Sequence, residues 1–347
     1  MRNNEYANLL SAKPVVVVAG LSASVLFSVL PVISAAETTG SLNECMLQRI
    51  DVENDDVTLG QLREKCLSAE TDQPDEDEPG AVTSRLRADD ISALRPYTLI
   101  PHRANYILVA AHNSKGFNAE PFRIAANDPT IELDDTEAQF QISIKFPLAI
   151  DLFDKNIDIF MAYTNRSFWQ VYNDEQSRPF RDTNHEPEAW IQFRPDWKIL
   201  GLNNSVNQLG INHQSNGRSS VLSRSWNRVF ANFVLERNNF ALSLKPWYRI
   251  EEDEADDNNP DIEDFLGYGE IRTAYKWHRN TFGFMLRNAF ESDFDFTTVE
   301  LSWSFPIFNY PHFRGYIQYF NGYGQSLVDY NQEVNSIGIG LSLSDYL

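Results

Sequence analysis

The sequence has few cysteines, a deficit of basic residues and, beyond its amino terminus, no long hydrophobic run. Its 347 residues include two cysteines, which excludes a disulfide-rich scaffold and a four-cysteine zinc site. Lysine and arginine number 29 against 49 acidic residues, and the resulting formal charge of −20 argues against nucleic acid as a partner. A mean hydropathy of −0.39 excludes a bundle of transmembrane helices. A membrane β-barrel is compatible with it, because barrel strands alternate between apolar and polar residues.

The amino terminus has the pattern of a secretory signal peptide. A mildly basic start is followed by an apolar run from Val15 to Val32, and small residues at 34–36 precede an acidic residue. This order predicts cleavage after Ala36 and removal of residues 1–36 as the signal peptide. A permanent membrane anchor is the alternative, because the apolar run is nearly long enough to cross a bilayer.

Residues 37–95 are predicted to form an acidic extension, partly helical and partly disordered. Cys45 and Cys66 lie in a segment with helix-like spacing of apolar residues. In an exported protein this favours one disulfide that closes a small helical hairpin, with two unpaired thiols as the alternative. The run ETDQPDEDEPG at 70–80 is acidic and contains proline, which is typical of a disordered linker.

From Tyr97 onward the hydrophobic period changes to two. Ile142 and Ile144 alternate with Gln141 and Ser143, and segments near 298–305 and 336–343 repeat the pattern. About twelve such segments follow one another between turn-rich breaks. A soluble sandwich would also alternate, but the export signal, the 13% aromatic content and an amphipathic last strand favour a membrane. We therefore expect residues 96–347 to form an all-β, twelve-stranded antiparallel transmembrane barrel with its apolar face outward.

One hairpin departs from the apolar outward pattern. His213 and Ser215 share strand parity with apolar residues of the same segment, and Asn227 does so in the next segment. With a turn near Ser220, His213 and Asn227 would lie opposite each other, with Cβ atoms roughly 5 Å apart. Polar groups that face hydrocarbon are costly and usually functional, and these three could serve as base, nucleophile and orienting group. The alternative is a position at the lipid headgroups, where polarity costs little.

The sequence around this hairpin, INHQSNGRSSVLSRSWNR at 211–228, resembles the signature of the outer-membrane phospholipase A family. Three further blocks resemble the same family: YTNRSFWQVYNDEQSRPFRDTNHEPE at 163–188, KPWYRI and DDNNPDI within 245–262, and GYGQSLVDYN at 322–331. The resemblance covers about residues 97–347. It implies a phospholipase A1/A2 of the Gram-negative outer membrane that needs calcium, hydrolyses acyl esters of phospholipids and lysophospholipids, and is active as a homodimer.

The resemblance also implies roles for individual residues. Ser215 is the expected nucleophile, His213 the base, and Asn227 the group that orients the imidazole. The expected calcium ligands are the Arg218 carbonyl, Ser223, Asp257 and, from the partner subunit, Ser177.

Some positions depart from the family pattern. The acidic loop has one additional residue before its proline, so Asp256 competes with Asp257 as the ligand. Ser220 occupies a position that is acidic in some relatives, and Asn165 one where the family has a glutamine in the dimer interface. The other histidines are expected to be ordinary barrel or loop residues: His102, His112, His185, His278 and His312.

Two other classes of protein share part of this pattern. A non-catalytic porin or adhesin barrel would have the same strands without the constellation of His213, Ser215 and Asn227. A soluble secreted esterase would have the constellation without lipid-facing strands.

Overall fold

In the computed structural model the barrel lies within one compact unit, Asp77–Leu347. The predicted signal peptide, the predicted Cys45–Cys66 disulfide and nearly all of the linker lie outside the described residues. The structure describes residues 58, 60, 61 and 79–347, the last range without 155, 196, 254, 289–292, 309 and 311.

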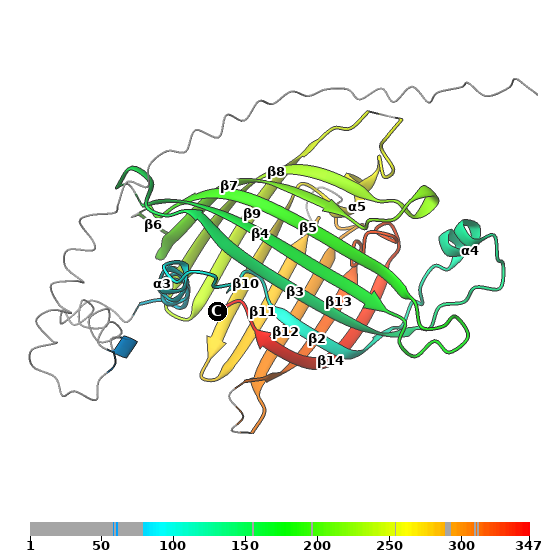
Figure 1. The fold of residues 1–347 in the computed structure, drawn as a ribbon, viewed down its shortest axis with the longest axis horizontal. Coiled ribbons are helices and arrows are strands. Elements are labelled where there is room, and N and C mark those ends of the chain that lie inside the picture. Colours follow the sequence, from blue (N-terminus) through cyan, green and yellow to red (C-terminus); the bar gives the residue numbers. More distant parts are fainter. Residues whose placement is uncertain are drawn as a thin grey trace, which may run out of the picture. The chain divides into compact units, whose positions relative to one another are not determined.

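Twelve long antiparallel strands of the described chain form a closed barrel, as the sequence predicts (Figure 1). Each strand pairs with its long neighbours in sequence, and pairing of the last with the first closes the barrel. Two short strands, β1 (Ile100–Pro101) and β6 (Lys198–Ile199), add to β3 and β7. The long strands are β2 (Asn105–Asn113), β3 (Thr136–Ala149), β4 (Ile157–Trp169), β5 (Phe180–Phe193), β7 (Leu202–Ser215), β8 (Ser225–Arg237), β9 (Phe240–Ile250), β10 (Gly269–Trp277), β11 (Asn280–Arg287), β12 (Thr298–Pro306), β13 (Arg314–Gly322) and β14 (Val334–Ser344).

The two faces of the barrel wall differ as the alternation predicts. In β3, Gln139 and Ser143 are fully buried in the interior, whereas Ile142 is 53% exposed on the outside. In β14, Ile337 and Ile339 are exposed and the polar Ser336 is buried. The outer surface is therefore apolar, which suits contact with lipid.

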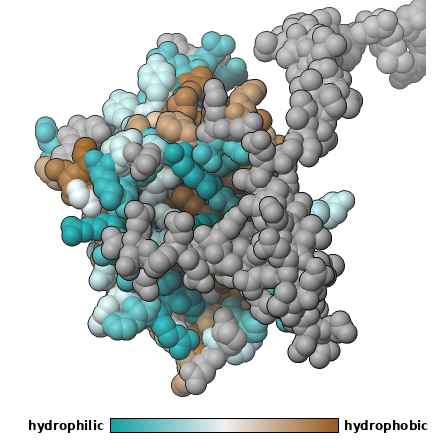
Figure 2. All heavy atoms as spheres, turned by 90° about the vertical axis from the view of Figure 1, so that its left-hand side faces the viewer, coloured by the Kyte–Doolittle hydropathy of each residue, from teal (hydrophilic) through white to brown (hydrophobic). Residues whose placement is uncertain are grey.

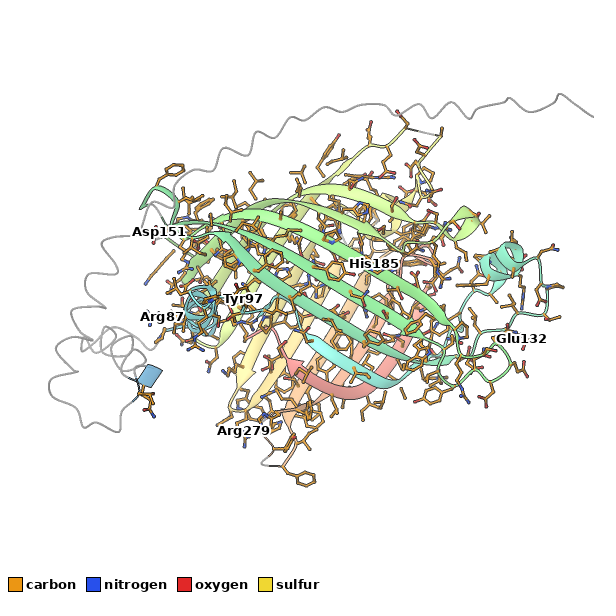
Figure 3. The ribbon with its side chains drawn as sticks, viewed as in Figure 1. Arg87, Tyr97, Glu132, Asp151, His185 and Arg279 are labelled. Carbon is orange, nitrogen blue, oxygen red and sulfur yellow. The ribbon has the colours of Figure 1, made fainter. Side chains whose placement is uncertain are left out.

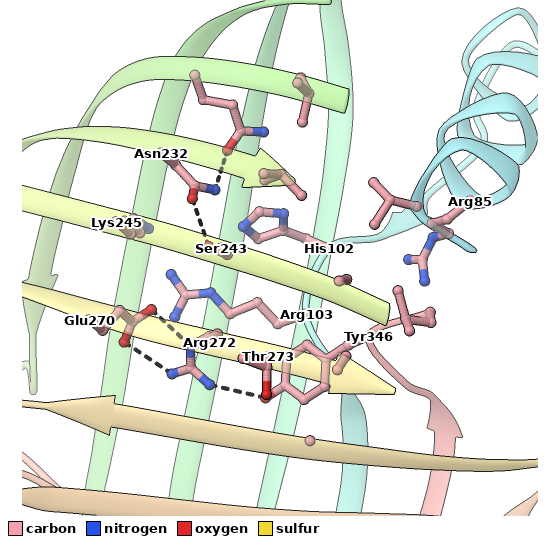
Figure 4. Close-up of a pocket in the computed structure, with 18 of the residues that line it drawn as sticks. Arg85, His102, Arg103, Asn232, Ser243, Lys245, Glu270, Arg272, Thr273 and Tyr346 are labelled. Atoms are coloured by element: carbon pink, nitrogen blue, oxygen red, sulfur yellow. Dashed lines mark hydrogen bonds and ion pairs between the residues drawn. The ribbon is translucent and has the colours of Figure 1, made fainter. Parts of the chain in front are cut away.

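Charged side chains fill much of the interior (Figure 4). Glu188 accepts hydrogen bonds from Arg103 at 2.9 Å and Lys245 at 3.3 Å, and Glu270 pairs with Arg272 at 2.8 Å. Buried charges are tolerated when they are paired and hydrogen-bonded in this way. A cavity of about 220 Å³ remains among these groups.

Helix α3 (Ala81–Ala93) belongs to the predicted extension but packs on the barrel. Glu236 of β8 accepts hydrogen bonds from the backbone N–H groups of Val82 and Thr83, which the first turn of a helix leaves unpaired. Asp89 pairs with Lys145 at 2.7 Å. The helix lies at the barrel end where the chain terminates, and Figure 2 shows hydrophilic side chains and hydrophobic patches at this end.

The remaining helical segments are short and lie between strands. Among the described residues, no helix is long and apolar enough to cross a membrane. These segments are α4 (Glu120–Ala126), α5 (Ile262–Leu266), η1 (Leu152–Asp154) and η2 (Ser220–Leu222).

Candidate active site

The antiparallel register of β7 and β8 brings His213 and Asn227 together. The two residues are directly opposite, as the predicted turn requires, and Ser215 lies opposite Ser225 at the end of the same hairpin. His213 and Ser215 share the outer face with Leu209 and Ile211, which are 58% and 60% exposed. The candidate triad therefore lies on the apolar outer wall of the barrel.

Hydrogen bonding determines which nitrogen of His213 carries the proton. Asn227 Oδ1 lies 2.8 Å from His213 Nδ1, and the Asn227 amide nitrogen donates to Glu252 Oε1 at 2.8 Å. Because an amide oxygen can only accept, His213 Nδ1 must be the donor. The neutral imidazole then has its lone pair on Nε2, which can accept a proton from a serine hydroxyl two residues away on the same face.

A second histidine, His185 of β5, lies beside Ser215, although its sequence context predicts an ordinary barrel residue (Figure 3). Its partners differ from those of His213. Tyr163 Oη lies 2.6 Å from His185 Nδ1, and the Asn165 amide nitrogen lies 3.5 Å from it. Neither partner is an obligate acceptor, so neither fixes a proton on Nδ1 of His185 as Asn227 does on Nδ1 of His213. His185 therefore lacks the contact that prepares His213 to act as a base.

Strand register is the signal that would reveal His185. The pairing of β5 with β7 places it opposite Ser215, and a Cβ at Gly217 would lie 3.8 Å from its Nε2. His185 lies within the block at 163–188 that resembles the family, but the block alone does not show which residue of the next strand it faces.

The predicted calcium ligands lie in the loops at the same end of the hairpin. Ser223 follows η2 directly, and Arg218 is exposed in the turn after Ser215. Asp257 accepts from Arg249 at 2.7 Å and from the Asn259 N–H at 3.0 Å, and Asn259 in turn accepts from the Ser225 N–H. This chain of hydrogen bonds holds the acidic loop against the start of β8, two residues after Ser223.

The donor chemistry of this set suits calcium. It consists of a carbonyl, hydroxyls and a carboxylate, all oxygen ligands of the kind that a hard cation prefers. No group of three or more His, Cys, Asp or Glu residues that could hold a metal occurs in the described part of the chain. The predicted ligand set itself contains one carboxylate, Asp257, beside neutral oxygen atoms.

The two positions predicted at the dimer interface lie on neighbouring elements. Ser177 is exposed in the turn between β4 and β5, with a positive φ of 57°. Asn165 lies on the outer face of β4, where its side-chain oxygen accepts from Ser167 Oγ at 3.0 Å. The Asn165 amide is thus already hydrogen-bonded within one protomer, so facing lipid is less costly for it than for an unpaired amide.

The blocks that carry the family resemblance meet in space. The Leu327 N–H donates to Asn184 at 3.1 Å and the Val328 N–H donates to Asp182 at 3.0 Å. Tyr330 donates to Asp261, and burial together with this hydrogen bond raises the pKa of the Tyr330 hydroxyl. These contacts join the loop between β13 and β14 to β5 and to the loop after β9, beside the candidate site.

Fold and site together define a class, the transmembrane β-barrels with a Ser-His-Asn constellation on the outer wall. The family model of phospholipase A1 matches residues 82–343 and begins within α3, earlier than the sequence resemblance. Phospholipase A1 of Escherichia coli K12 is 35% identical over 250 residues, which cover 72% of this chain and 83% of the relative.

Solved structures agree with the family match. Outer membrane phospholipase A from Escherichia coli is 33% identical with a TM-score of 0.65, covering 73% of this chain and 94% of that one, and the same values hold for its active-site mutant with alanine in place of an asparagine. The Salmonella typhi outer membrane phospholipase dimer with bound calcium is 32% identical with a TM-score of 0.66, covering 74% and 96%. The chain belongs to the phospholipase A1 family and is a phospholipase of the Gram-negative outer membrane.

Proposed function

We propose that the protein hydrolyses the acyl ester bonds of membrane phospholipids and lysophospholipids, with calcium as cofactor, at a Ser215–His213–Asn227 triad, and that the active form is a homodimer. The 2.8 Å contact between His213 Nδ1 and Asn227 Oδ1 carries this proposal. It gives the imidazole the tautomer of a base, on the barrel face where lipid is the solvent. The related active-site asparagine mutant from Escherichia coli supports a role for Asn227.

The proposed reaction uses the three side chains in sequence. His213 Nε2 takes the Ser215 hydroxyl proton while Ser215 Oγ attacks the ester carbonyl carbon. Collapse of the tetrahedral intermediate breaks the ester C–O bond, and the leaving alkoxide takes the proton from His213. Water, deprotonated by His213, then attacks the acyl carbon. The bond between that carbon and Ser215 Oγ breaks, His213 returns the proton to Ser215, and the fatty acid leaves. Asn227 holds the imidazole in the reactive tautomer throughout.

Calcium would be held by the Arg218 carbonyl, Ser223, Asp257 and the partner subunit's Ser177. When bound, it would supply positive charge that stabilises the oxyanion of the intermediate. The dimeric, calcium-bound Salmonella typhi relative supports both the metal and the second subunit. The position of the site supports the dimer as well, because a second barrel against this wall would give the acyl chain an enclosing surface.

Labelling and calcium removal test the proposal. A sulfonyl fluoride should attach covalently to Ser215 in the calcium-loaded protein, and mass spectrometry of the labelled peptide should place the adduct within residues 211–228. Chelation should stop hydrolysis of defined phospholipids, and added calcium should restore it. Turnover at the full rate in excess chelator, or hydrolysis that persists in Ser215→Ala, would contradict the proposed chemistry.

A further inference from the structure

Glu252 lies directly behind the candidate triad. It is the second residue after strand β9, whose last residue, Ile250, pairs with Asn227. Glu252 Oε1 accepts the hydrogen bond from the Asn227 amide nitrogen at 2.8 Å, and Asn227 Oδ1 meets His213 Nδ1 at the same distance. Glu252 is half-buried, whereas its neighbours Glu251 and Asp253 are exposed.

An asparagine at this position can adopt two amide orientations that differ in hydrogen bonding, whereas the two orientations of an aspartate are equivalent. The two ends of its amide are nearly equal in shape, but one only accepts hydrogen bonds and the other only donates. If the amide of Asn227 turned over, its nitrogen would face His213 Nδ1 and force the imidazole proton onto Nε2. That tautomer cannot take the proton of Ser215. A carboxylate avoids the problem, because both of its oxygen atoms accept.

We propose that Glu252 is a positioning residue that holds Asn227 in its reactive orientation. The inference rests on the proposed function of the triad and adds a residue to it. Glu252 accepts its hydrogen bond from Asn227 and acts through that residue. A carboxylate can only accept, so it selects the amide nitrogen and leaves the amide oxygen for His213. The chain of contacts Glu252–Asn227–His213 thereby sets the position of the imidazole proton.

Three variants of the full-length protein test this role in a calcium-saturated assay. Glu252→Ala should lower kcat on the order of tenfold with little change in KM, about the factor that a hydrogen bond to a charged group supplies. Glu252→Gln should keep kcat within about threefold of the wild type, because its amide oxygen still accepts. Glu251→Ala, the matched control, should be indistinguishable from wild type. The proposal is overturned if Glu252→Ala keeps the full kcat or if Glu252→Gln falls as far.

A double-mutant cycle separates orientation from general structure. In an Asn227→Asp background the group opposite His213 no longer needs orienting, so adding Glu252→Ala should not lower kcat further. It should raise kcat, because two neighbouring carboxylates repel each other. An additive loss would refute the positioning role. If Asn227→Ala kept full activity, the proposed role of Asn227 in the triad would be wrong. If Asn227→Ala lost activity while Glu252→Ala kept it, the triad would stand and only the role proposed for Glu252 would be wrong.

Discussion

The side chains around Ser215 show how hydrogen-bond partners give two imidazoles different chemistry. His213 meets an amide oxygen, which fixes its proton on Nδ1, whereas His185 meets a tyrosine hydroxyl and an amide nitrogen, neither of which does so. Only His213 has a partner that requires a lone pair at Nε2. The proposed assignment of His213 as the base therefore rests on its partners, because both rings lie beside Ser215.

The triad variants should differ in severity. Ser215→Ala and His213→Ala should reduce ester hydrolysis to background. The first removes the oxygen that attacks the ester carbonyl, and the second removes the nitrogen that accepts the proton. Asn227→Ala should retain more activity, since Asn227 orients the base and does not react. Steady-state rates with a defined phospholipid measure these effects, with the heat-dependent mobility of the folded barrel in gels as a control. Equal inactivity of Asn227→Ala and Ser215→Ala would contradict the orienting role.

A variant of His185 tests the assignment of the base. His185→Phe keeps a ring at this position but removes both nitrogen atoms, and we expect activity well above that of His213→Ala. A loss of less than about tenfold is expected, the size of one hydrogen bond toward the site. Loss of sulfonyl fluoride labelling in His185→Phe, together with its retention in His213→Ala, would show that His185 is the base and His213 is not.

At the scale of elements, the sequence predicts where the strands lie, but it predicts poorly which residues of different strands and loops face each other. The period of two predicts the twelve strands and the face on which His213, Ser215 and Asn227 lie, because side-chain direction follows strand parity. Register follows across the β7–β8 hairpin once its turn is placed near Ser220, which sets His213 opposite Asn227. It does not follow between β5 and β7, so His185 is missed, nor into the loop after β9, so Glu252 is missed. Helix α3 is also missed, since its docking depends on Glu236, far away in sequence.

The attachment of α3 should depend on Glu236. Glu236→Ala would leave the N–H groups of Val82 and Thr83 without their carboxylate partner and cost about 1 kcal/mol or more, as for other helix caps. We expect faster amide hydrogen exchange confined to residues 81–93. Gly80→Ala should act similarly, because a Cβ there would lie 2.0 Å from Glu236 Oε2. Unchanged exchange in both variants would contradict this view of the docking.

The acidic loop after β9 should set calcium affinity. Asp257→Ala should raise the calcium concentration required for half-maximal activity, because it removes the charged ligand of the proposed set. Arg249 now pairs with this carboxylate at 2.7 Å and would compete with the metal. Arg249→Ala should therefore shift the requirement in the opposite direction. Calcium titration of both variants measures the shifts, and a larger effect of Asp256→Ala would assign the ligand to that residue.

At the scale of the whole molecule, the barrel separates a charged interior from an apolar outer wall on which the proposed triad lies. Interior carboxylates such as Glu188 are engaged by several cations and lie away from Ser215. The triad, by contrast, opens onto the surface that faces lipid. On a single barrel, His213 is exposed and Ser215 half-buried on this outer wall, so an acyl chain bound there would be only partly enclosed. The remaining surface has to come from the membrane or from a second barrel.

Dimerisation and calcium binding should therefore strengthen each other. If Ser177 of the partner subunit completes the calcium site, each event must favour the other by the same factor. We expect calcium to shift the protein in detergent from monomer to dimer, by a factor on the order of tenfold in the association constant, the usual size of such coupling. Analytical ultracentrifugation with and without calcium, supported by crosslinking, measures the shift.

Two substitutions distinguish this linkage from simple contact between barrels. Ser177→Ala should reduce the effect of calcium on association while leaving the calcium-free monomer unchanged. Asn165→Ala should weaken association with or without calcium, and only slightly, because the Asn165 amide is already bonded to Ser167 and polar contacts of this kind in membranes contribute about 1 kcal/mol. A monomer that binds calcium and turns over at the full rate would show that the second barrel is not needed for catalysis.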